Sequence, residues 1–166
     1  MFKITVNRDT RSNKDILQFD DVSITYKNFS GVGGPYNREG DRSFSIIIPD
    51  EDTARDLLDM GWKVKIKEPR EEGDMPFIHM PVKVKFNGRG PIIYLKSGPE
   101  RRQLTEDEVG ILDRISIKHI DLDVRPYDWD RPDGSNGRTT YLAAMYVEQE
   151  IDRFYQRFAE EEYPQE

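Results

Sequence analysis

The chain has 166 residues, with no cysteine and only two histidines. The absence of cysteine excludes disulfide frameworks, thiol nucleophiles and every zinc site built on thiolates. Because His79 and His119 are the only imidazoles, a histidine-based metal site has few possible ligands. We therefore expect no metal ion and no cofactor, and any metal chemistry would have to rest on carboxylates.

The sequence also lacks long hydrophobic runs. No apolar stretch approaches the 18 residues that a membrane-spanning helix requires, and no basic leader precedes an apolar core. We therefore expect a soluble, cytoplasmic protein with no membrane partner. A chain of this length buries about two-thirds of its unfolded surface on folding, which is enough for one domain without crosslinks.

Negative charge predominates, but it is unevenly distributed. The formal net charge is −7, yet residues 61–102 hold ten Lys/Arg against five Asp/Glu, a balance of +5. Residues 148–166 hold two Lys/Arg against seven Asp/Glu, a balance of −5. Such segregation allows a basic surface to bind polyanions although the whole protein is acidic. The alternative is an ordinary solvated surface with uneven charges.

Two segments with alternating lysines indicate where a basic surface would lie. Residues 63–67 (KVKIK) and 82–86 (VKVKF) alternate with a period of two, so their five lysines point away from the apolar residues. If the two strands are neighbours, lysines lie opposite one another, which destabilises a sheet unless an anion lies across it. The alternative is that the lysines protect an exposed sheet edge against aggregation.

The remaining segments predict further strands and two short helices. Alternation predicts strands over residues 22–29, 43–48 and 91–96. Asp50 is predicted to cap a helix that ends before Gly61. Thr105 and Glu108 form a capping box, which predicts the start of a second helix.

The C-terminal residues show helical rather than strand periodicity. Four large apolar residues recur at helical spacing ahead of three glutamates, namely Ile151, Phe154, Tyr155 and Phe158. This pattern predicts an amphipathic helix that either packs on its own domain or contacts a partner or a second subunit. We therefore divide the chain into a domain over 1–150 and a C-terminal helix with an acidic tail over 151–166.

Short strands at irregular spacing, separated by glycine and proline, favour a small barrel or sandwich over a parallel α/β sheet. We predict an all-β, or β-rich, fold: a five-stranded Greek-key barrel of the oligonucleotide-binding (OB) type. It would carry extended hairpins, short inserted helices and the C-terminal amphipathic helix. A jelly roll or an α+β sandwich is the alternative.

The segment His119–Val147 reads as two strands joined by a loop. The returning strand is apolar on both faces, which predicts a central, buried position. Tyr127 and Trp129 lie at the end of the first strand, where they either plug the barrel mouth or provide a platform for stacking. In the second case, nearby arginines would contact phosphates, namely Arg125, Arg131 and Arg138.

Three segments carry a resemblance to a known family: Asn28–Gly31, Tyr36–Gly40 and Arg125–Val147. Together with the order of elements over residues 20–150, they resemble bacteriophage single-stranded DNA-binding proteins of OB fold. In such proteins, aromatic and basic residues of the barrel face and loops hold the strand. The resemblance implies DNA-contacting roles for Phe29, Tyr36, Arg38, Trp62, Lys63, Lys65, Lys83, Lys85, Tyr127 and Trp129.

The resemblance also implies partners and a location. Single-stranded DNA would be the main partner, in phage DNA replication or recombination in the host-cell cytoplasm. The C-terminal helix would support a homodimer or bind a replication or recombination protein. The chain departs from the bacterial pattern because the segment Glu162–Glu166 has no aromatic residue at its last position, which argues against a partner-docking tail of that kind.

Enzymatic functions find little support. Asp121 and Asp123, or Asp128 and Asp130, could hold magnesium in a nuclease, but no third ligand follows at a recognisable spacing. No phosphate-binding loop and no nucleophile elbow is present. We therefore predict a non-catalytic protein that binds single-stranded DNA with little sequence preference. The alternative is a protein-interaction module that uses the barrel and the C-terminal helix.

Overall fold

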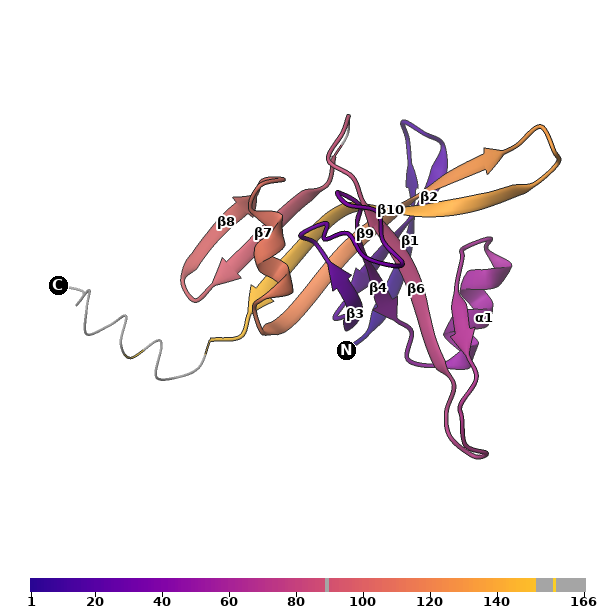
Figure 1. Cartoon of the computed structure of the whole chain (residues 1–166), viewed down its shortest axis with the longest axis horizontal. Coiled ribbons are helices and arrows are strands. Elements are labelled where there is room, and N and C mark those ends of the chain that lie inside the picture. Colours follow the sequence, from indigo (N-terminus) through magenta and orange to yellow (C-terminus); the bar gives the residue numbers. More distant parts are fainter. Residues whose placement is uncertain (89, 152–156, 158–166) are drawn as a thin grey trace.

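The computed structural model describes residues 1–88, 90–151 and 157, and they form one mixed β-sheet with two short helices (Figure 1). The ten strands are β1 (Lys3–Asp9), β2 (Lys14–Asp20), β3 (Ile24–Asn28), β4 (Arg42–Ile47), β5 (Lys65–Lys67), β6 (Phe77–Val84), β7 (Ile92–Ser97), β8 (Glu100–Leu104), β9 (Ile117–Asp130) and β10 (Asn136–Gln149). The helices are α1 (Glu51–Asp59) and a 3₁₀ helix, η1 (Val109–Asp113). The predicted β-rich class is confirmed.

The sheet is built around β9 and β10. Its main order is β1-β2-β9-β10-β6-β4-β3, with β5 on β6, β7 on β10 and β8 on β7. Strand β10 pairs antiparallel with β9 and parallel with β6 and β7, so its predicted central position is confirmed. Among the described strands, β1 and β3 do not pair, and the sheet stays open. Ten strands replace the expected five because alternation identifies the apolar face of a strand but not its neighbours.

The hydrophobic core lies on the inner face of the sheet. Strand β6 shows the pattern most clearly, because Ile78, Met80 and Val82 are buried while the residues between them point outward. One cluster of buried residues joins β2, β4, β6, β7, β9 and β10 to both helices. Burying a side chain of this size typically contributes about 1.5–3 kcal/mol. The core therefore holds the outer face of β6 in a fixed orientation.

The predicted helix start at Asp50 is confirmed, but the capping box predicted at Thr105 does not form, since the second helix begins after Glu108 and has no side-chain capping bond. Asp50 caps α1 by accepting a hydrogen bond from the backbone N–H of Thr53 at 2.7 Å. Thr105 Oγ1 donates to Glu108 Oε1 at 2.9 Å ahead of η1. The second element is a 3₁₀ helix of five residues.

Two strands depart from the predicted alternation. In β10, the register with β9 shifts between Leu142 and Ala144, so the inward residues change from even to odd numbers at this bulge. In β3, the register with β4 shifts after Thr25, and Tyr26 has a φ of 52°. Strict alternation over the predicted strand 22–29 would place Tyr26 on the same face as Val22 and Ile24, but the bulge reverses the side on which the following residues point.

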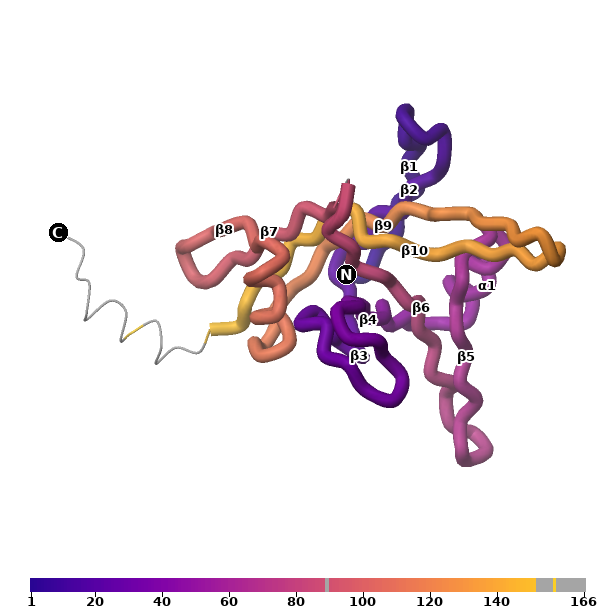
Figure 2. Tube along the Cα trace, turned by 45° about the horizontal axis from the view of Figure 1, so that its top comes forward, coloured from indigo at the N-terminus to yellow at the C-terminus, as the bar shows by residue number. Residues whose placement is uncertain are grey.

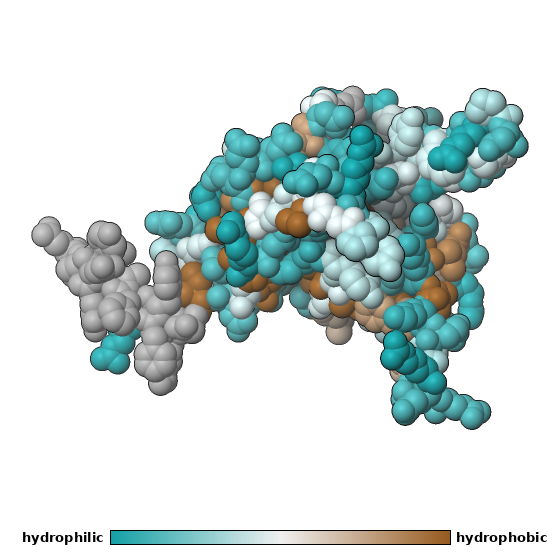
Figure 3. Space-filling view, in the orientation of Figure 1, coloured by the Kyte–Doolittle hydropathy of each residue, from teal (hydrophilic) through white to brown (hydrophobic). Residues whose placement is uncertain are grey.

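Three hairpins project from the sheet in different directions: β1–β2, β5–β6 and β9–β10 (Figure 2). The β1–β2 hairpin was not predicted, although its strands pair over seven residues and β2 joins the sheet by pairing with β9. Figure 3 shows that the tips of the β5–β6 and β9–β10 hairpins are hydrophilic. These tips are therefore surface extensions of the sheet.

The predicted C-terminal helix lies outside the described residues except for Ile151 and Arg157. Its role in self-association or partner binding stays a prediction, as does the division of the chain at residue 150. Within the part of the chain that the structure describes, no helix is both long and apolar enough to cross a membrane.

Candidate nucleic-acid interface

The outer face of the sheet around β6 gathers basic and aromatic side chains. Phe77, His79 and Lys83 alternate with buried residues along β6 and therefore share this face. Strand β5 continues it, because Lys67 pairs with Phe77 and Lys65 pairs with His79. Lysines from two different strands thus lie on one surface.

The register corrects one expectation about these lysines. The two lysine-bearing strands are neighbours. However, Lys65 lies opposite His79 and Lys67 lies opposite Phe77, so lysine does not lie opposite lysine. Within the described residues, no carboxylate lies within 4.0 Å of the ammonium groups of Lys65, Lys67, Lys83 or Lys85. Their charges are therefore available to an external anion.

Four of the predicted residues line one hollow of about 570 Å³ beside the end of β6: Tyr36, Arg38, Lys83 and Lys85. We call it the loop hollow, because residues 36–43 form one wall and residues 83–87 the other, with Glu106 at the side. The Tyr36 ring is fully exposed. Residues that are distant in sequence thus meet around one cavity with four cationic side chains, of which Arg42 is paired with Glu106.

Asparagine side chains hold the wall of the loop hollow in place. Asn28 exchanges two hydrogen bonds of 3.0 Å with the backbone of Val32. Asn37 Nδ2 donates to the carbonyl oxygens of Val32 at 2.8 Å and of Asp41 at 3.1 Å. Both asparagines belong to the segments on which the family resemblance rests, and their role here is to shape the loop.

A pair of aromatic rings adjoins the loop hollow. Tyr127 on β9 and Tyr141 on β10 meet edge to face with their centroids 6.1 Å apart, and Tyr127 is 57% exposed. The Lys85 ammonium lies 5.7 Å from the centre of the Tyr141 ring. Arg125 pairs with Tyr141 across the two strands. Exposed rings beside cations are the components that stack bases and neutralise phosphates.

A second aromatic group lies at the other end of β6 and was not predicted. The Tyr26 ring meets Phe77 at 6.2 Å and His79 at 5.3 Å, both edge to face. His79 Nδ1 lies 2.9 Å from Ser45 Oγ, and burial together with nearby Lys65 lowers the pKa of His79. Alternation could not predict this aromatic group, because the bulge in β3 turns Tyr26 to the outer face.

Two predicted contacts are core residues. Phe29 is completely buried and stacks on Phe44 with centroids 5.2 Å apart, and Trp62 is 3% exposed. A buried ring cannot stack on a base without disrupting its own packing, so both residues leave the candidate interface. Lys63 is exposed just before β5, beside Trp62 in the sequence.

Side chains at the tip of the β9–β10 hairpin make contacts within the hairpin itself. Trp129 is half-buried, and its ring packs so closely on Gly137 that a Cβ there would lie 2.6 Å from it. The Arg131 guanidinium lies 4.8 Å from the centre of the Trp129 ring. Trp129 therefore stands neither fully in solvent nor in the core.

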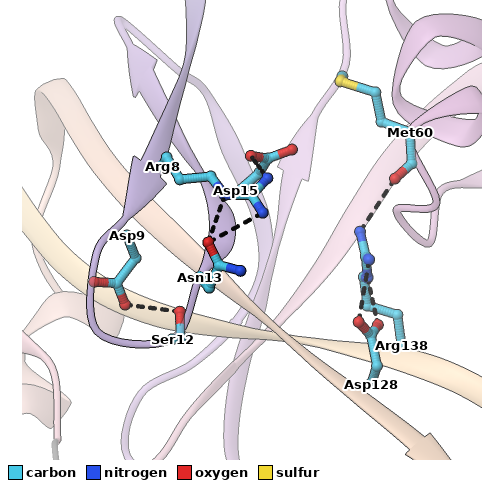
Figure 4. A network of polar contacts seen from close by, with 8 residues as sticks. All are labelled: Arg8, Asp9, Ser12, Asn13, Asp15, Met60, Asp128 and Arg138. Atoms are coloured by element: carbon cyan, nitrogen blue, oxygen red, sulfur yellow. Dashed lines mark hydrogen bonds and ion pairs between the residues drawn. The ribbon is translucent and has the colours of Figure 1, made fainter.

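Arg138 uses its donors within the protein. It donates to both carboxylate oxygens of Asp128, at 2.6 and 3.2 Å, and to the carbonyl of Met60 at 3.2 Å (Figure 4). Its guanidinium also lies 4.9 Å from the Trp62 ring centre. This arginine fastens the hairpin to the end of α1, so we assign it a structural role.

Three of the aspartates considered for a nuclease, Asp121, Asp123 and Asp128, are engaged with other groups. Asp121 accepts hydrogen bonds from the Asp21 backbone N–H at 2.9 Å and lies 2.8 Å from His119 Nε2. Among the described residues, no group of three or more His, Asp or Glu side chains could hold a metal ion. Asp121 therefore organises the link between β2 and β9.

An open face that combines unpaired lysines with exposed rings is typical of proteins that bind single-stranded nucleic acid. The family model described as "Putative phage ssDNA-binding domain" matches residues 6–165, so the chain belongs to this family. It is a family of DNA-binding rather than catalytic proteins. The resemblance inferred from the sequence is confirmed. No curated protein matches the sequence.

Solved structures of the single-stranded DNA-binding protein of bacteriophage Enc34 share the fold. One has 11% identity and a TM-score of 0.54, covering 92% of this chain and 93% of that one. A C-terminally truncated form has 13% identity and a TM-score of 0.51, covering 90% and 97%. A complex with ssDNA has 14% identity and a TM-score of 0.51, covering 84% and 89%. At such identities the likeness is one of fold.

Proposed function

We propose that this protein binds single-stranded DNA with little sequence preference, through the outer face of β6 and the loop hollow. The observation that carries the proposal is that unpaired lysines and exposed aromatic rings lie on one surface. Family membership and the Enc34 complex with ssDNA support the choice of ligand. The proposed role is in phage DNA replication or recombination, in the host-cell cytoplasm.

The lysines would act mainly by releasing counterions from the DNA. For single strands, the logarithm of the binding constant falls with the logarithm of the salt concentration, with a slope of about −0.7 per neutralised phosphate. Lys83, Lys85 and Arg38 line the same hollow, so a strand that crosses it would meet three cations besides Arg42, which is paired with Glu106. Affinity is therefore expected to weaken strongly as salt rises.

Stacking would supply the second contribution. Tyr36 and Tyr127 are exposed next to these cations, and base stacking on an aromatic side chain is worth about 1–3 kcal/mol per base. Every base has a face that can stack, so this contact discriminates little between sequences. We further infer that the open sheet is an elaborated OB-type fold whose extra strands belong to extended hairpins.

A charge reversal tests the proposal. The Lys83→Glu/Lys85→Glu variant is compared with Lys3→Glu/Lys118→Glu, which makes the same change in net charge on exposed residues of β1 and β9. Binding of a labelled oligo-dT is followed by fluorescence anisotropy at low salt, and thermal unfolding checks that both variants fold. We expect the first variant to lose at least about tenfold in affinity and the control to lose much less.

Equal losses in both variants would mean that only net charge matters and would remove the proposed site. Intrinsic fluorescence offers an independent check. Trp62 is buried, so a salt-sensitive change on adding DNA is expected to come from Trp129. The Trp129→Phe variant should abolish this change while still binding DNA.

A further inference from the structure

A second hollow, of about 300 Å³, lies at the far end of β6 from the loop hollow. We call it the hairpin hollow, because the β5–β6 hairpin forms most of its wall and Tyr26 of β3 closes it. Its apolar lining comes from Tyr26, Met75 and Phe77, and its cations are Lys67 and Arg70, with Glu68 as the one acidic neighbour. A cavity of this size with rings and cations suits a nucleobase and its phosphate.

The rings in the hairpin hollow offer both a face and an edge. Tyr26 and Phe77 are perpendicular, whereas Phe77 and His79 are inclined by 33° with centroids 5.4 Å apart. A flat base that stacks on one ring would therefore meet the edge of the other, an arrangement that aromatic groups favour. Tyr26 is 60% exposed, so such a base would find its ring accessible.

The backbone at Tyr26 supports a functional role. Its φ of 52° is in the left-handed region, which bulky residues rarely adopt. The conformation breaks the alternation of β3 and turns the ring to the outer face beside Phe77. Strained positions of this kind concentrate at binding sites, where the side-chain position compensates for the strain.

Charge changes sign just beyond the hairpin hollow. Lys65 and Lys67 lie on the side toward the rest of β6, whereas the turn of the hairpin carries Glu71, Glu72 and Asp74. A phosphate is attracted on the first side and repelled on the second. The turn therefore marks an end to any path that a polyanion follows along this face.

The two hollows are too far apart for a very short oligonucleotide. Phe77 and Lys83 are six residues apart on one strand, which corresponds to about 20 Å. Both lie on the same outer face, so one strand can run from one to the other. OB-type domains bind about 4–16 nucleotides, and only the longer part of this range would engage both hollows.

From these observations we propose that the hairpin hollow is a terminal base-stacking site, at which the bound strand ends against the acidic turn. The inference rests on the proposed function and adds to it a second contact point and a limit to the strand's path. It assigns DNA contacts to Tyr26, Phe77 and Lys67, which lie outside the loop hollow.

An oligonucleotide length series tests the inference. Tyr26→Gly removes the ring and suits the positive φ, whereas Tyr26→Phe keeps the ring. Tyr94→Ala, on β7 outside both hollows, controls for the loss of an exposed tyrosine. Affinities are measured for oligo-dT of about 4 to 16 nucleotides. We expect Tyr26→Gly to weaken binding of the longest strand by between fivefold and a hundredfold, and of the shortest hardly at all.

The outcomes separate this inference from the proposed function. If Tyr26→Gly binds the longest strand as tightly as the wild type, the terminal site is wrong, even where Lys83→Glu/Lys85→Glu still abolishes binding. If Tyr26→Gly weakens all lengths equally, Tyr26 belongs to the main site and the separation of the two contacts is wrong. Loss of binding in Tyr94→Ala would overturn the assignment of the path.

Neutralising the turn tests the limit to the path. The Glu71→Gln/Glu72→Gln/Asp74→Asn variant removes three negative charges from the hairpin tip. We expect severalfold tighter binding for strands longer than the wild-type site and unchanged binding for shorter ones. Equal gains at every length would show that the turn acts only through net charge.

Discussion

The outer face of the sheet has two halves of opposite charge. The halves also differ in whether their charged groups have partners within the protein. In the basic half, formed by Lys65, Lys67, Lys83 and Lys85, no described carboxylate lies within ion-pair distance. The acidic half is formed by Asp20, Asp21, Asp121 and Asp123 on and beside β2 and β9. There Asp21 and Asp121 meet internal partners.

The contacts of the acidic half show how its charges are satisfied. The N-terminal ammonium lies 2.6 Å from Asp21, and His119 lies between Asp21 and Asp121 at 3.4 and 2.8 Å. Charges that already have partners contribute less to the potential that an incoming polyanion meets than charges without them. A protein with a net charge of −7 can therefore still present a basic face to a polyanion.

The largest expected effect comes from neutralising the basic half. Changing all four lysines to glutamine should weaken binding of oligo-dT and reduce the slope of log affinity against log salt by up to about 3, since each phosphate contact contributes about 0.7. Neutralising all four aspartates of the acidic half (Asp20→Asn/Asp21→Asn/Asp121→Asn/Asp123→Asn) is the matched control, provided thermal unfolding shows that it folds, and should leave the slope unchanged. Slopes come from anisotropy titrations at several salt concentrations. If both variants change the slope alike, the two halves do not differ in function.

A smaller effect is expected from Asp123, the least satisfied carboxylate of the acidic half. Burial, together with Asp20 and Asp121, raises its pKa, although a hydrogen bond with Gln18 opposes the change. A raised pKa in the folded state means that ionisation costs stability as the pH rises past this value. Asp123→Asn should therefore raise the free energy of unfolding at pH 7 by up to about 1 kcal/mol and have no such effect near pH 3. Urea denaturation at the two pH values measures the difference, and a loss of stability at pH 7 would contradict it.

The smallest effect concerns His79 in the basic half. Burial and nearby Lys65 lower its pKa, so the folded state binds a proton less readily than the unfolded state. Stability should be unaffected above the ordinary histidine pKa of about 6.5 and should fall as the pH drops below it. His79→Gln should remove this part of the acid sensitivity. Melting temperatures across this pH range provide the measurement, and identical profiles for wild type and His79→Gln would refute the assignment.

Much of the fold could be predicted where one face of a strand is buried. The alternation of β4, β6 and the first half of β9 follows from their contact with the core, and the cap at Asp50 is a local hydrogen bond. The β1–β2 hairpin escaped prediction because its alternation is weak, with Val6 on β1 being 45% exposed. Strand number and sheet closure depend on contacts between distant segments, which periodicity does not report.

The candidate site was predicted in part for the same reason. Lys83 and Lys85 alternate with buried residues, so their outward orientation could be predicted from the sequence. The sequence did not distinguish Phe29 and Trp62 from aromatic residues on the surface, because the residue type alone does not show whether an aromatic side chain is buried. Tyr26 reaches the outer face through the bulge in β3, and the bulge in β10 separates outward Tyr141 from inward Met145 and Val147, which only the pairing with other strands reveals.

By itself, the sequence determined the β-rich class, the segregation of charge and the presence of a lysine-bearing strand face, because these follow from composition and from the two-residue period of a strand. Only the tertiary structure decided which lysines remain without carboxylate partners, which aromatic rings are exposed and which residues meet around a hollow. These properties depend on distances between residues that the chain separates. The β9–β10 hairpin illustrates both contributions. Its two strands could be predicted from the sequence, but the half-buried position of Trp129 depends on Gly137 across the strand pair.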